Sequence, residues 1–523
     1  MSINCIRTLI ERAAETHADK TALVFNETSL TYGELFTKVN QVAFYLNELG
    51  LEKGSRVGIY SNKSVEQVIS ILAILSTDYI LVPLTRLLKP EQVEYIIGDC
   101  DINCIITDRL KLESIEEINF DGHIISYETT SKDIPSLEEI FKYYNKPYSC
   151  DVNGHDNAVI TYSFGLTGTP KGIVLSHRNL IDSARVVSQY LNLEEDDVIS
   201  GLLIFNLDYG LNQIFCAFYK KATLALHRFI LPDDFFNHLM DDQVTILPLM
   251  PVNISQMFDE DVSRIPGPEL FDHVKTITSS GGNVTVKMID DCKSTFRKAN
   301  FYSMHGLTEA FRSTYLDPGQ VLIRPDSIGK PIPDVELYVL NEEGKECAPR
   351  EVGELIHRGG YIYRGFWNAP EETAERFKSV QILKDVVNLD GQLTDEVVVA
   401  SGDYVYKDEE GYFYFVSRHD DMIKTRGFRV SPFEVESVVA KNIPQIEQCA
   451  VFGMENQAIE EEVVMVYSAP AEIPEKEILF ELKKHLASYI IPSRVIYKRS
   501  LPLVQSDKNR INKDALKREL SEE

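Results

Sequence analysis

The sequence is poor in basic residues for its length and contains no long hydrophobic run. Its 523 residues include 53 Lys and Arg against 80 Asp and Glu, which gives a formal net charge of −27. Nucleic acids and anionic membranes bind proteins through basic surfaces, so this balance disfavours both as partners. The apolar run over residues 68–76 is too short to cross a bilayer and is typical of a buried helix. We therefore expect no nucleic-acid partner and no membrane span.

The sequence also lacks cysteine pairs at metal-site spacing and a recognisable signal peptide. Its eight cysteines are scattered, and although Cys100 and Cys104 are close together, no second pair accompanies them. Scattered thiols of this kind are typical of a reducing compartment. Residues 1–10 contain no long apolar stretch and are typical of a helix, so no signal peptide is expected. These features predict a cytoplasmic protein.

The length and the hydrophobic pattern predict more than one domain. A chain of 523 residues is too long for a single core. Short apolar runs at residues 57–60, 79–84 and 104–107 alternate with helical patterns, which is typical of an α/β fold with a mostly parallel sheet. Residues 320–415 are richer in short strands and turns, and residues 420–523 have the pattern of a small α+β unit.

The segment Thr161-Tyr-Ser-Phe-Gly-Leu-Thr-Gly-Thr-Pro-Lys-Gly172 lies between two apolar runs that we expect to be strands. Its glycines allow backbone N–H groups to approach an anion closely, and Lys171 adds a positive charge. The segment differs from the Walker pattern because Lys171 is followed by Gly172 rather than by Ser or Thr. Phosphate binding is the function that it suggests. A glycine-rich surface turn without a ligand is the alternative interpretation.

Further motifs follow this segment in a fixed order. They are His305-Gly-Leu-Thr-Glu309, residues 365–377, Ser401-Gly-Asp403, residues 417–429 and a late lysine, Lys508. In this order they resemble the motifs of the AMP-forming adenylating enzymes, the superfamily of acyl-CoA synthetases, amino-acid adenylation domains and luciferase. The resemblance covers nearly the whole chain, and five motifs in sequence make it far more specific than any one of them.

The resemblance implies an acid–thiol ligase with ATP and Mg²⁺ as cofactors. A carboxylate attacks the α-phosphorus of ATP to give an acyl-adenylate, and a phosphopantetheine thiol then displaces AMP. The thiol belongs to CoA or to a separate carrier protein, which we expect to act in trans because no carrier domain follows residue 523. The resemblance also implies a large domain over residues 1–419 and a small mobile lid over residues 420–523, with Asp420 as the hinge. An ordinary solvated loop is the alternative for Asp420.

The resemblance assigns the nucleotide site residue by residue. The phosphate loop contributes Ser163, Gly165, Thr167, Gly168 and Lys171. His305 would lie against adenine, Asp403 would accept the ribose hydroxyls, and Arg418 would make a second ribose or phosphate contact. The catalytic residues would be Thr308 at the α-phosphate, Glu309 as the Mg²⁺ ligand, and Lys508 between the substrate carboxylate and the α-phosphate. The alternatives are an exposed turn for His305, surface charges for Asp403 and Arg418, and a merely basic tail for Lys508.

Some residues depart from the family pattern. Phe164 and Leu166 stand where the phosphate loop usually has hydroxyls, and Asp507 replaces the glycine before the catalytic lysine. A lost hydrogen bond to a charged group costs about 1.5–3 kcal/mol. These departures leave open a nucleotide-binding paralogue with weakened catalysis.

The segment over residues 205–215 is the candidate acid pocket. Asp208 stands where amino-acid adenylation domains carry the aspartate that pairs with the substrate ammonium, and a buried ammonium needs such a partner. The alternative is that Asp208 caps the following helix. Arg312 is expected either to meet a second anionic or polar group of the substrate or to form a salt bridge within the fold. By resemblance, the other pocket residues are Tyr209, Asn212, Ser279, Gly281 and Met304. The substrate is therefore a carboxylic acid, with an amino acid as the first interpretation and a plain organic or fatty acid as the second.

Overall fold

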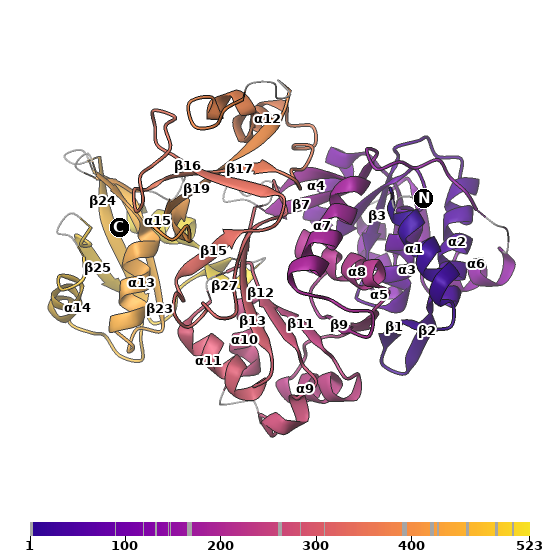
Figure 1. Cartoon of the computed structure of the whole chain (residues 1–523), viewed down its shortest axis with the longest axis horizontal. Coiled ribbons are helices and arrows are strands. Elements are labelled where there is room, and N and C mark those ends of the chain that lie inside the picture. The colour runs from indigo at the N-terminus through magenta and orange to yellow at the C-terminus, as the bar shows by residue number, and fades with distance from the viewer. Residues whose placement is uncertain are drawn as a thin grey trace. The chain divides into compact units, whose positions relative to one another are not determined.

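The computed structural model in Figure 1 describes most of the chain. The described residues are 4–88, 90–118, 120–130, 133–144, 146, 148–164, 170–259, 264–282, 284–307, 309–389, 395–418, 423–425, 428–456, 460–486, 490–504 and 507–522. They pack as two compact units. The first comprises Met1–Leu337, His357–Ile382 and Leu389–Val399, and the second comprises Tyr338–Ile356, Leu383–Asn388 and Ala400–Glu523.

The first unit begins with a sheet in the strand order β6-β5-β3-β4-β7-β8, parallel throughout except for the antiparallel pair β7–β8. Its strands are β3 (Arg56–Tyr60), β4 (Ile80–Leu84), β5 (Ile102–Thr107), β6 (His123–Ser126), β7 (Asn157–Phe164) and β8 (Pro170–Ser176). The helices of this part are α1 (Ile6–His17), α2 (Tyr32–Glu48), α3 (Val65–Ile74), α4 (Pro90–Cys100), α5 (Arg109–Glu117) and α6 (Leu137–Tyr143). Every residue of β4 is buried, as expected for a parallel strand that is covered on both faces.

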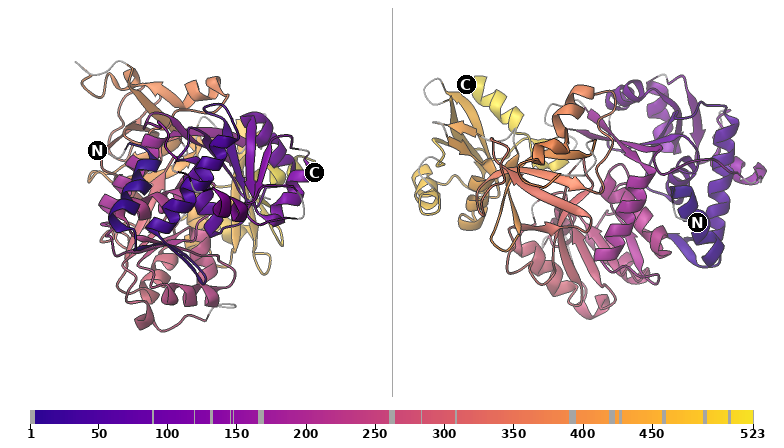
Figure 2. Two further views of the ribbon diagram at one scale, coloured as in Figure 1. Left: turned by 90° about the vertical axis from the view of Figure 1, so that its right-hand side faces the viewer. Right: turned by 45° about the horizontal axis from the view of Figure 1, so that its top comes forward.

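A second sheet in the same unit carries most of the candidate acid pocket. Within this unit its strand order is β15-β14-β13-β12-β11-β9-β10-β1-β2, and the strands from β13 to β1 run parallel. The strands are β1 (Thr21–Phe25), β2 (Thr28–Thr31), β9 (Val198–Gly201), β10 (Thr223–Leu226), β11 (Ile246–Leu249), β12 (Thr276–Ser279), β13 (Asn300–Gly306), β14 (Arg312–Leu316) and β15 (Ser327–Pro331). The accompanying helices are α7 (His177–Tyr190), α8 (Asp208–Lys220), α9 (Pro232–Asp241), α10 (Pro251–Met257) and α11 (Val286–Thr295). A further helix of this unit, α12 (Pro370–Arg376), lies beside β8 of the first sheet. Figure 2 shows the same ribbon from two further sides.

Local sequence signals account for the ends of α2. Thr31 and Glu34 form a capping box at its beginning, each side chain bonding the backbone N–H of the other residue. Gly50, just beyond the helix, has a φ of +68°, which a residue without a side chain adopts at little cost. Both ends of α2 are therefore determined by residues within one or two positions of the helix.

The second unit contains the small α+β fold that the sequence predicts. Its elements are β20 (Phe413–Arg418), β21 (Ile423–Thr425), β22 (Phe428–Val430), α13 (Pro432–Asn442), β23 (Gln448–Asn456), β24 (Glu460–Ser468), α14 (Glu475–Leu482), β25 (Arg494–Tyr497), β26 (Leu503–Val504), β27 (Asp507–Ile511) and α15 (Lys513–Glu522). Val435 and Val439 of α13 pack with Val451, Met465 and Leu482 in one hydrophobic cluster. The α/β fold class with a smaller α+β part is thus confirmed.

The predicted strand-rich region over residues 320–415 contains β15 and four further strands. These are β16 (Val335–Leu340), β17 (Gly353–Gly359), β18 (Phe377–Ser379) and β19 (Val397–Lys407). Three of these, β16, β17 and β19, have residues in both units, and the short β18 belongs to the first unit. The domain boundary at residue 420 stays a prediction, because the division by packing does not test a hinge and Asp420 lies outside the described residues.

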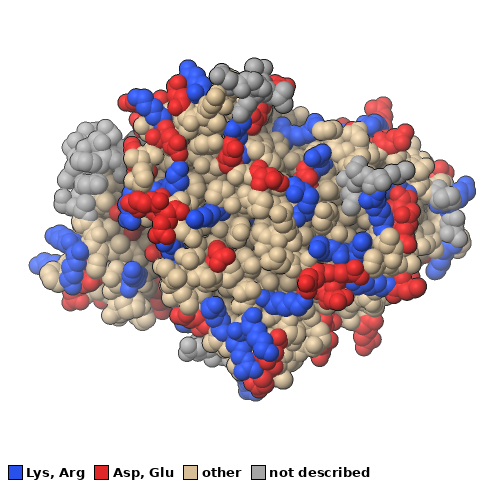
Figure 3. Space-filling view, viewed as in Figure 1, with Lys and Arg blue, Asp and Glu red and all other residues tan. Residues whose placement is uncertain are grey.

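In the described part of the chain, no helix combines the length and the apolar character needed to cross a bilayer. On the face shown in Figure 3, Asp and Glu side chains are interspersed with Lys and Arg.

Candidate active site

The predicted phosphate loop joins the two strands of a β-hairpin. β7 and β8 are antiparallel, with Ser163 opposite Lys171 and Phe164 opposite Pro170. The strands therefore extend further into the glycine-rich motif than the apolar runs at its two ends suggest. Residues 165–169, which include the predicted Gly165, Thr167 and Gly168, lie outside the described residues.

A second predicted motif lies along the outer edge of this hairpin. The backbone N–H of Val174 donates to the carbonyl of Gly365 (3.0 Å), and that of Trp367 donates to the carbonyl of Gly172 (2.8 Å). A Cβ placed on Gly172 would lie 2.8 Å from Ile160 Cγ2 and 3.2 Å from the Cβ of Trp367. Gly172 is needed for this close approach, so the glycine after Lys171 has a packing role as well as a role in the motif.

Lys171 itself forms an ion pair. Its Nζ lies 3.3 Å from Oε1 of Glu372 in the first turn of α12, and the two side chains are 40% and 39% exposed. A backbone N–H and the Lys171 ammonium hold the pKa of Glu372 below its usual range. The hairpin therefore presents a solvent-accessible cation at the end of the predicted phosphate loop, a position suited to a phosphate oxygen.

The His-Gly-Leu-Thr-Glu motif forms the connection between β13 and β14. These strands are antiparallel, and His305 pairs with Thr314. The carbonyl of Glu309 accepts a hydrogen bond from the backbone N–H of Tyr363 (3.0 Å), and Thr308 lies outside the described residues. Among the described residues, no group of three or more His, Cys, Asp or Glu side chains could hold a metal ion. The single carboxylate of Glu309 can bind Mg²⁺ only if phosphate oxygens of a nucleotide and water complete the coordination, which is the usual arrangement for Mg²⁺ with nucleotides.

Two of the predicted nucleotide residues are neighbours in the second unit. Asp403 on β19 pairs in register with Arg418 on β20, and Arg418 Nε lies 3.4 Å from Asp403 Oδ1. The Asp403 carboxylate is nearly buried whereas Arg418 is exposed, so the strand pair presents an anchored acceptor beside an accessible cation. Lys508 lies on β27, which pairs with β26.

The acid pocket is built around the beginning of α8. Asp208 is the first residue of this helix and Leu207 is its N-cap, so Asp208 does not occupy the capping position that the alternative interpretation requires. Instead, Asp208 Oδ1 accepts a hydrogen bond from the N–H of Tyr209 at 2.8 Å. The helix packs tightly here, because a Cβ on Gly210 would lie 1.8 Å from the carbonyl oxygen of Ile204.

The carboxylate of Asp208 lies in an environment that disfavours its charge. Burial raises its pKa, and the main opposing influence is the positive charge of Arg312, followed by backbone N–H groups and the hydroxyl of Tyr363. A carboxylate with a raised pKa beside a pocket is a candidate partner for a cationic group.

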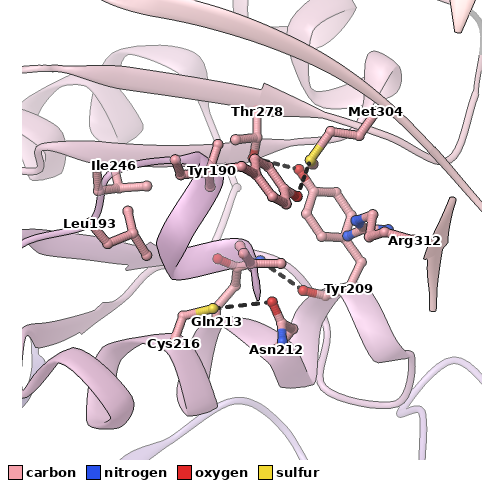
Figure 4. A pocket seen from close by; sticks show the side chains of 12 residues that line it. Tyr190, Leu193, Tyr209, Asn212, Gln213, Cys216, Ile246, Thr278, Met304 and Arg312 are labelled. Carbon is pink, nitrogen blue, oxygen red and sulfur yellow. Dashed lines mark hydrogen bonds between the residues drawn. The ribbon is translucent and has the colours of Figure 1, made fainter. Parts of the chain in front are cut away.

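Several of the predicted substrate residues line one pocket (Figure 4). The Tyr209 hydroxyl is 2.8 Å from Thr278 Oγ1, and the Tyr190 hydroxyl is 3.1 Å from the sulfur of Met304. Asn212 donates to Ser183 Oγ at 3.1 Å. The pocket is lined by Val187, Tyr190, Leu191, Leu193, Tyr209, Asn212, Gln213, Cys216, Ile246, Thr278, Met304 and Arg312.

Asp208, Ser279 and Gly281 are not among the residues that line this pocket. Asp208 directly precedes the lining residue Tyr209, and Ser279 and Gly281 follow its Thr278 wall. Ser279 is fully buried at the end of β12, and its Oγ has no hydrogen-bond partner. Gly281 has a φ of +85°, which favours glycine, in the turn that follows.

Two aromatic residues of the site were missed by sequence reasoning. Tyr190, at the end of α7, lines the pocket and stacks on Tyr315 with ring centroids 4.6 Å apart. Tyr363 interacts with the carboxylate of Asp208 through its hydroxyl. Tyr363 precedes the motif at residues 365–377 by two positions, and that proximity is the one signal that could have drawn attention to it.

Comparisons with known proteins were made against families, curated sequences and solved structures. The family model described as "AMP-binding enzyme" matches residues 10–367, and the model of the "AMP-binding enzyme C-terminal domain" matches residues 434–508. Tyrocidine synthase 1 of Brevibacillus parabrevis is 25% identical over 96% of this chain and 44% of its own length. Bacitracin synthase 3 of Bacillus licheniformis is 27% identical over 96% of this chain and 7% of its own length. The chain thus spans less than half the length of these curated relatives.

Solved structures share the fold along the whole chain. ATP-bound MatB from Rhodopseudomonas palustris superposes with a TM-score of 0.84 at 24% identity, covering 99% of each chain. The o-succinylbenzoate CoA synthetase of Bacillus subtilis, in complex with its acyl-adenylate, gives a TM-score of 0.82 at 22% identity, covering 97% of each chain.

Proposed function

Because the chain belongs to the AMP-binding enzyme family of AMP-forming acid–thiol ligases, we propose that it activates an amino acid as an aminoacyl-adenylate at the expense of ATP. In the second half-reaction it transfers the aminoacyl group to a phosphopantetheine thiol of CoA or of a separate carrier protein. The observation that carries the amino-acid substrate is the position of Asp208, at the first turn of α8 beside the pocket, with its pKa raised by burial.

The argument for an ammonium group rests on charge. A carboxylate whose ionised form is disfavoured by burial gains most from a cation that it can contact directly. The α-ammonium of an amino acid supplies that cation, and Asp208 would orient it by a charge-assisted hydrogen bond. The same contact would place the substrate carboxylate at a fixed distance from Asp208, ready to attack the α-phosphorus.

The proposed nucleotide contacts follow the family motifs, each taken by itself. Lys171 would donate to the β- or γ-phosphate, Glu309 would hold Mg²⁺, and Asp403 would accept the ribose hydroxyls with Arg418 beside it. Bound Mg²⁺ neutralises charge on the phosphates. Lys508 would bridge the substrate carboxylate and the α-phosphate during adenylate formation, with Asp420 as the hinge for the change to thioester formation.

A second candidate is an acyl-CoA synthetase for a non-amino organic acid. It is favoured by the influence of Arg312, which already offsets part of the charge of Asp208 and so reduces the need for a substrate ammonium. A third candidate, a nucleotide-binding paralogue with weakened catalysis, is motivated by Phe164, Leu166 and Asp507 in the motifs.

Carboxylate-dependent exchange between ATP and pyrophosphate, measured over a panel of amino and organic acids, separates these candidates. Exchange with an amino acid supports the proposal. Exchange with organic acids alone supports the second candidate, and ATP binding without exchange for any acid supports the third.

Asp208→Asn tests the role of Asp208 within the first candidate. The substitution keeps the shape of the side chain and removes its charge, so the amino acid would lose about 3–5 kcal/mol of transition-state binding, whereas its des-amino analogue would lose little. An unchanged ratio of kcat/KM for the two acids would overturn the assignment of Asp208.

A further inference from the structure

Arg312 is a buried cation in the wall of the acid pocket. It is the first residue of β14 and is 4% exposed. Its guanidinium carbon lies 4.2 Å from the ring centroid of Tyr209 and 5.0 Å from that of Phe311. Figure 4 shows Arg312 beside Tyr209. One N–H group of Arg312 reaches the hydroxyl of Tyr190. An aromatic ring attracts the cation without occupying its remaining N–H donors.

The N–H edge of Arg312 is incompletely satisfied. Its Nε is buried and has no hydrogen-bond partner. In the part of the chain that the structure describes, no carboxylate forms an ion pair with Arg312. Asp208 acts on it only electrostatically, without a direct ion pair. Arginine stays protonated in proteins, and an unpaired charged donor away from water is strongly unfavourable.

Two charged side chains, Arg312 in the pocket wall and Asp208 beside the pocket, define the charge of the ligand. If the α-ammonium of the substrate pairs with Asp208, the negative charge of Asp208 is taken up, and Arg312 is left in the pocket wall as an uncompensated cation. A substrate that carries a second anionic group removes this imbalance, because the pocket then holds two opposite pairs. A neutral amide could accept one hydrogen bond from Arg312 but would leave its charge uncompensated.

We propose that Arg312 binds an anionic group on the side chain of the substrate, so that the preferred substrate is an amino acid with an acidic side chain. This inference rests on the proposed function, since it concerns the same pocket. Arg312 would accordingly determine specificity, and the reacting carboxylate would remain with the groups that hold the phosphates.

Pairs of isosteric substrates test this assignment in the wild-type protein. ATP–pyrophosphate exchange is measured with aspartate against asparagine and with glutamate against glutamine. We expect kcat/KM for the preferred acid to exceed that for its amide by roughly 100-fold or more, because only the acid compensates the buried guanidinium. Equal activity with acid and amide, or activity confined to acids with neutral or cationic side chains, would overturn the inference.

Substitutions of Arg312 connect the preference to this residue. Arg312→Met keeps an unbranched side chain and removes its charge, so the ratio of kcat/KM for the acid to kcat/KM for its amide should fall to near one. Arg312→Lys keeps a cation and should retain part of the preference, which also provides a test if the methionine variant does not fold. Arg178→Met removes a 64% exposed arginine of the same unit and should leave the ratio unchanged.

The outcomes separate this inference from the proposed function. Absence of exchange with every acid overturns the proposed function itself. Exchange with amino acids whose acid-to-amide ratio does not respond to Arg312→Met overturns the specificity assignment alone. A loss that is equal for acidic and monocarboxylic substrates would show that Arg312 holds the reacting carboxylate instead, and would also overturn the assignment.

Discussion

Lys171 and Glu372 are 201 positions apart in the sequence and form an ion pair, with Nζ and Oε1 separated by 3.3 Å. Lys171 is the last predicted contact of the phosphate loop, and Glu372 comes from the motif that lies along the hairpin edge. A nucleotide that uses Lys171 must therefore bring its phosphates close to a resident carboxylate, which offsets part of the lysine charge.

Glu372→Gln is expected to strengthen binding of phosphate-bearing ligands. It removes a negative charge next to Lys171, and because both side chains are well exposed the gain is small, up to about fivefold in the Kd of ATP or pyrophosphate. Isothermal titration calorimetry at low and high salt measures this change in Kd, and the difference between variant and wild type should shrink at high salt. Glu371→Gln removes the same charge one residue earlier in α12 and is the matched control. Weaker binding in Glu372→Gln would show that Glu372 instead holds Lys171 in position.

Lys508→Ala is expected to affect the two half-reactions unequally. If Lys508 bridges carboxylate and α-phosphate only while the adenylate forms, pyrophosphate exchange should fall by about 100-fold or more. Thiolysis of pre-formed acyl-adenylate should be nearly unchanged. Lys517→Ala, in the same C-terminal segment, serves as the charge-matched control. Equal losses in both half-reactions would argue against the assignment.

Gly210→Ala is expected to damage the acid pocket. The new Cβ would meet the carbonyl oxygen of Ile204 at 1.8 Å, so the first turn of α8 must move, and with it Asp208. Overpacking of this kind costs about 1–3 kcal/mol. The KM for the acid should rise more than tenfold while the Kd of ATP changes little. Gly98→Ala is the control, because a Cβ there has no atom within 4 Å and a helical alanine is slightly favoured. A normal KM in Gly210→Ala would show that the helix end adapts.

Stability is expected to fall as the pH falls from about 6.5 to about 4, in part through His357. Burial lowers the pKa of His357 from 6.5 to about 4, against the smaller effect of the Gly360 carbonyl. Between these pH values the unfolded chain binds the proton at His357 and the folded protein does not. The contribution of His357 to the free energy of unfolding is therefore fully present above pH 6.5, and up to about 3 kcal/mol is lost as the pH falls to 4.

Urea unfolding at several pH values measures this effect. His357→Gln should flatten the pH dependence of the free energy of unfolding, because glutamine cannot take up the proton. The exposed His155 provides the control variant His155→Gln. A pH dependence that is identical in wild type and His357→Gln would contradict the explanation.

The features that sequence could predict are those with local determinants. The helix that stops at Gly50 was predictable because its capping box and terminal glycine act within a few residues. The family, the enzyme class and the α/β fold followed from motifs that are short and ordered. The lengths of strands β7 and β8 were underestimated. The two strands pair with each other, and this pairing extends them through residues that are not apolar.

The features that sequence could not predict depend on tertiary packing. Nothing near Lys171 indicates Glu372, and nothing in α7 marks Tyr190 as a pocket residue. The interpretation of Asp208 as a helix cap failed by one position, because Leu207 occupies the N-cap. The surroundings of Arg312 likewise depend on packing, because Tyr209 of α8 reaches its guanidinium only when β14 and α8 come together.

The chain contains a single tryptophan, Trp367, and its indole N–H donates to the carbonyl of Asp99 at 3.1 Å while its backbone N–H bonds Gly172. The tryptophan fluorescence of the protein therefore comes from a single position beside the hairpin that carries Lys171. Stopped-flow mixing with nucleotide can consequently follow events at the phosphate hairpin in unlabelled wild-type protein, separately from changes at the acid pocket.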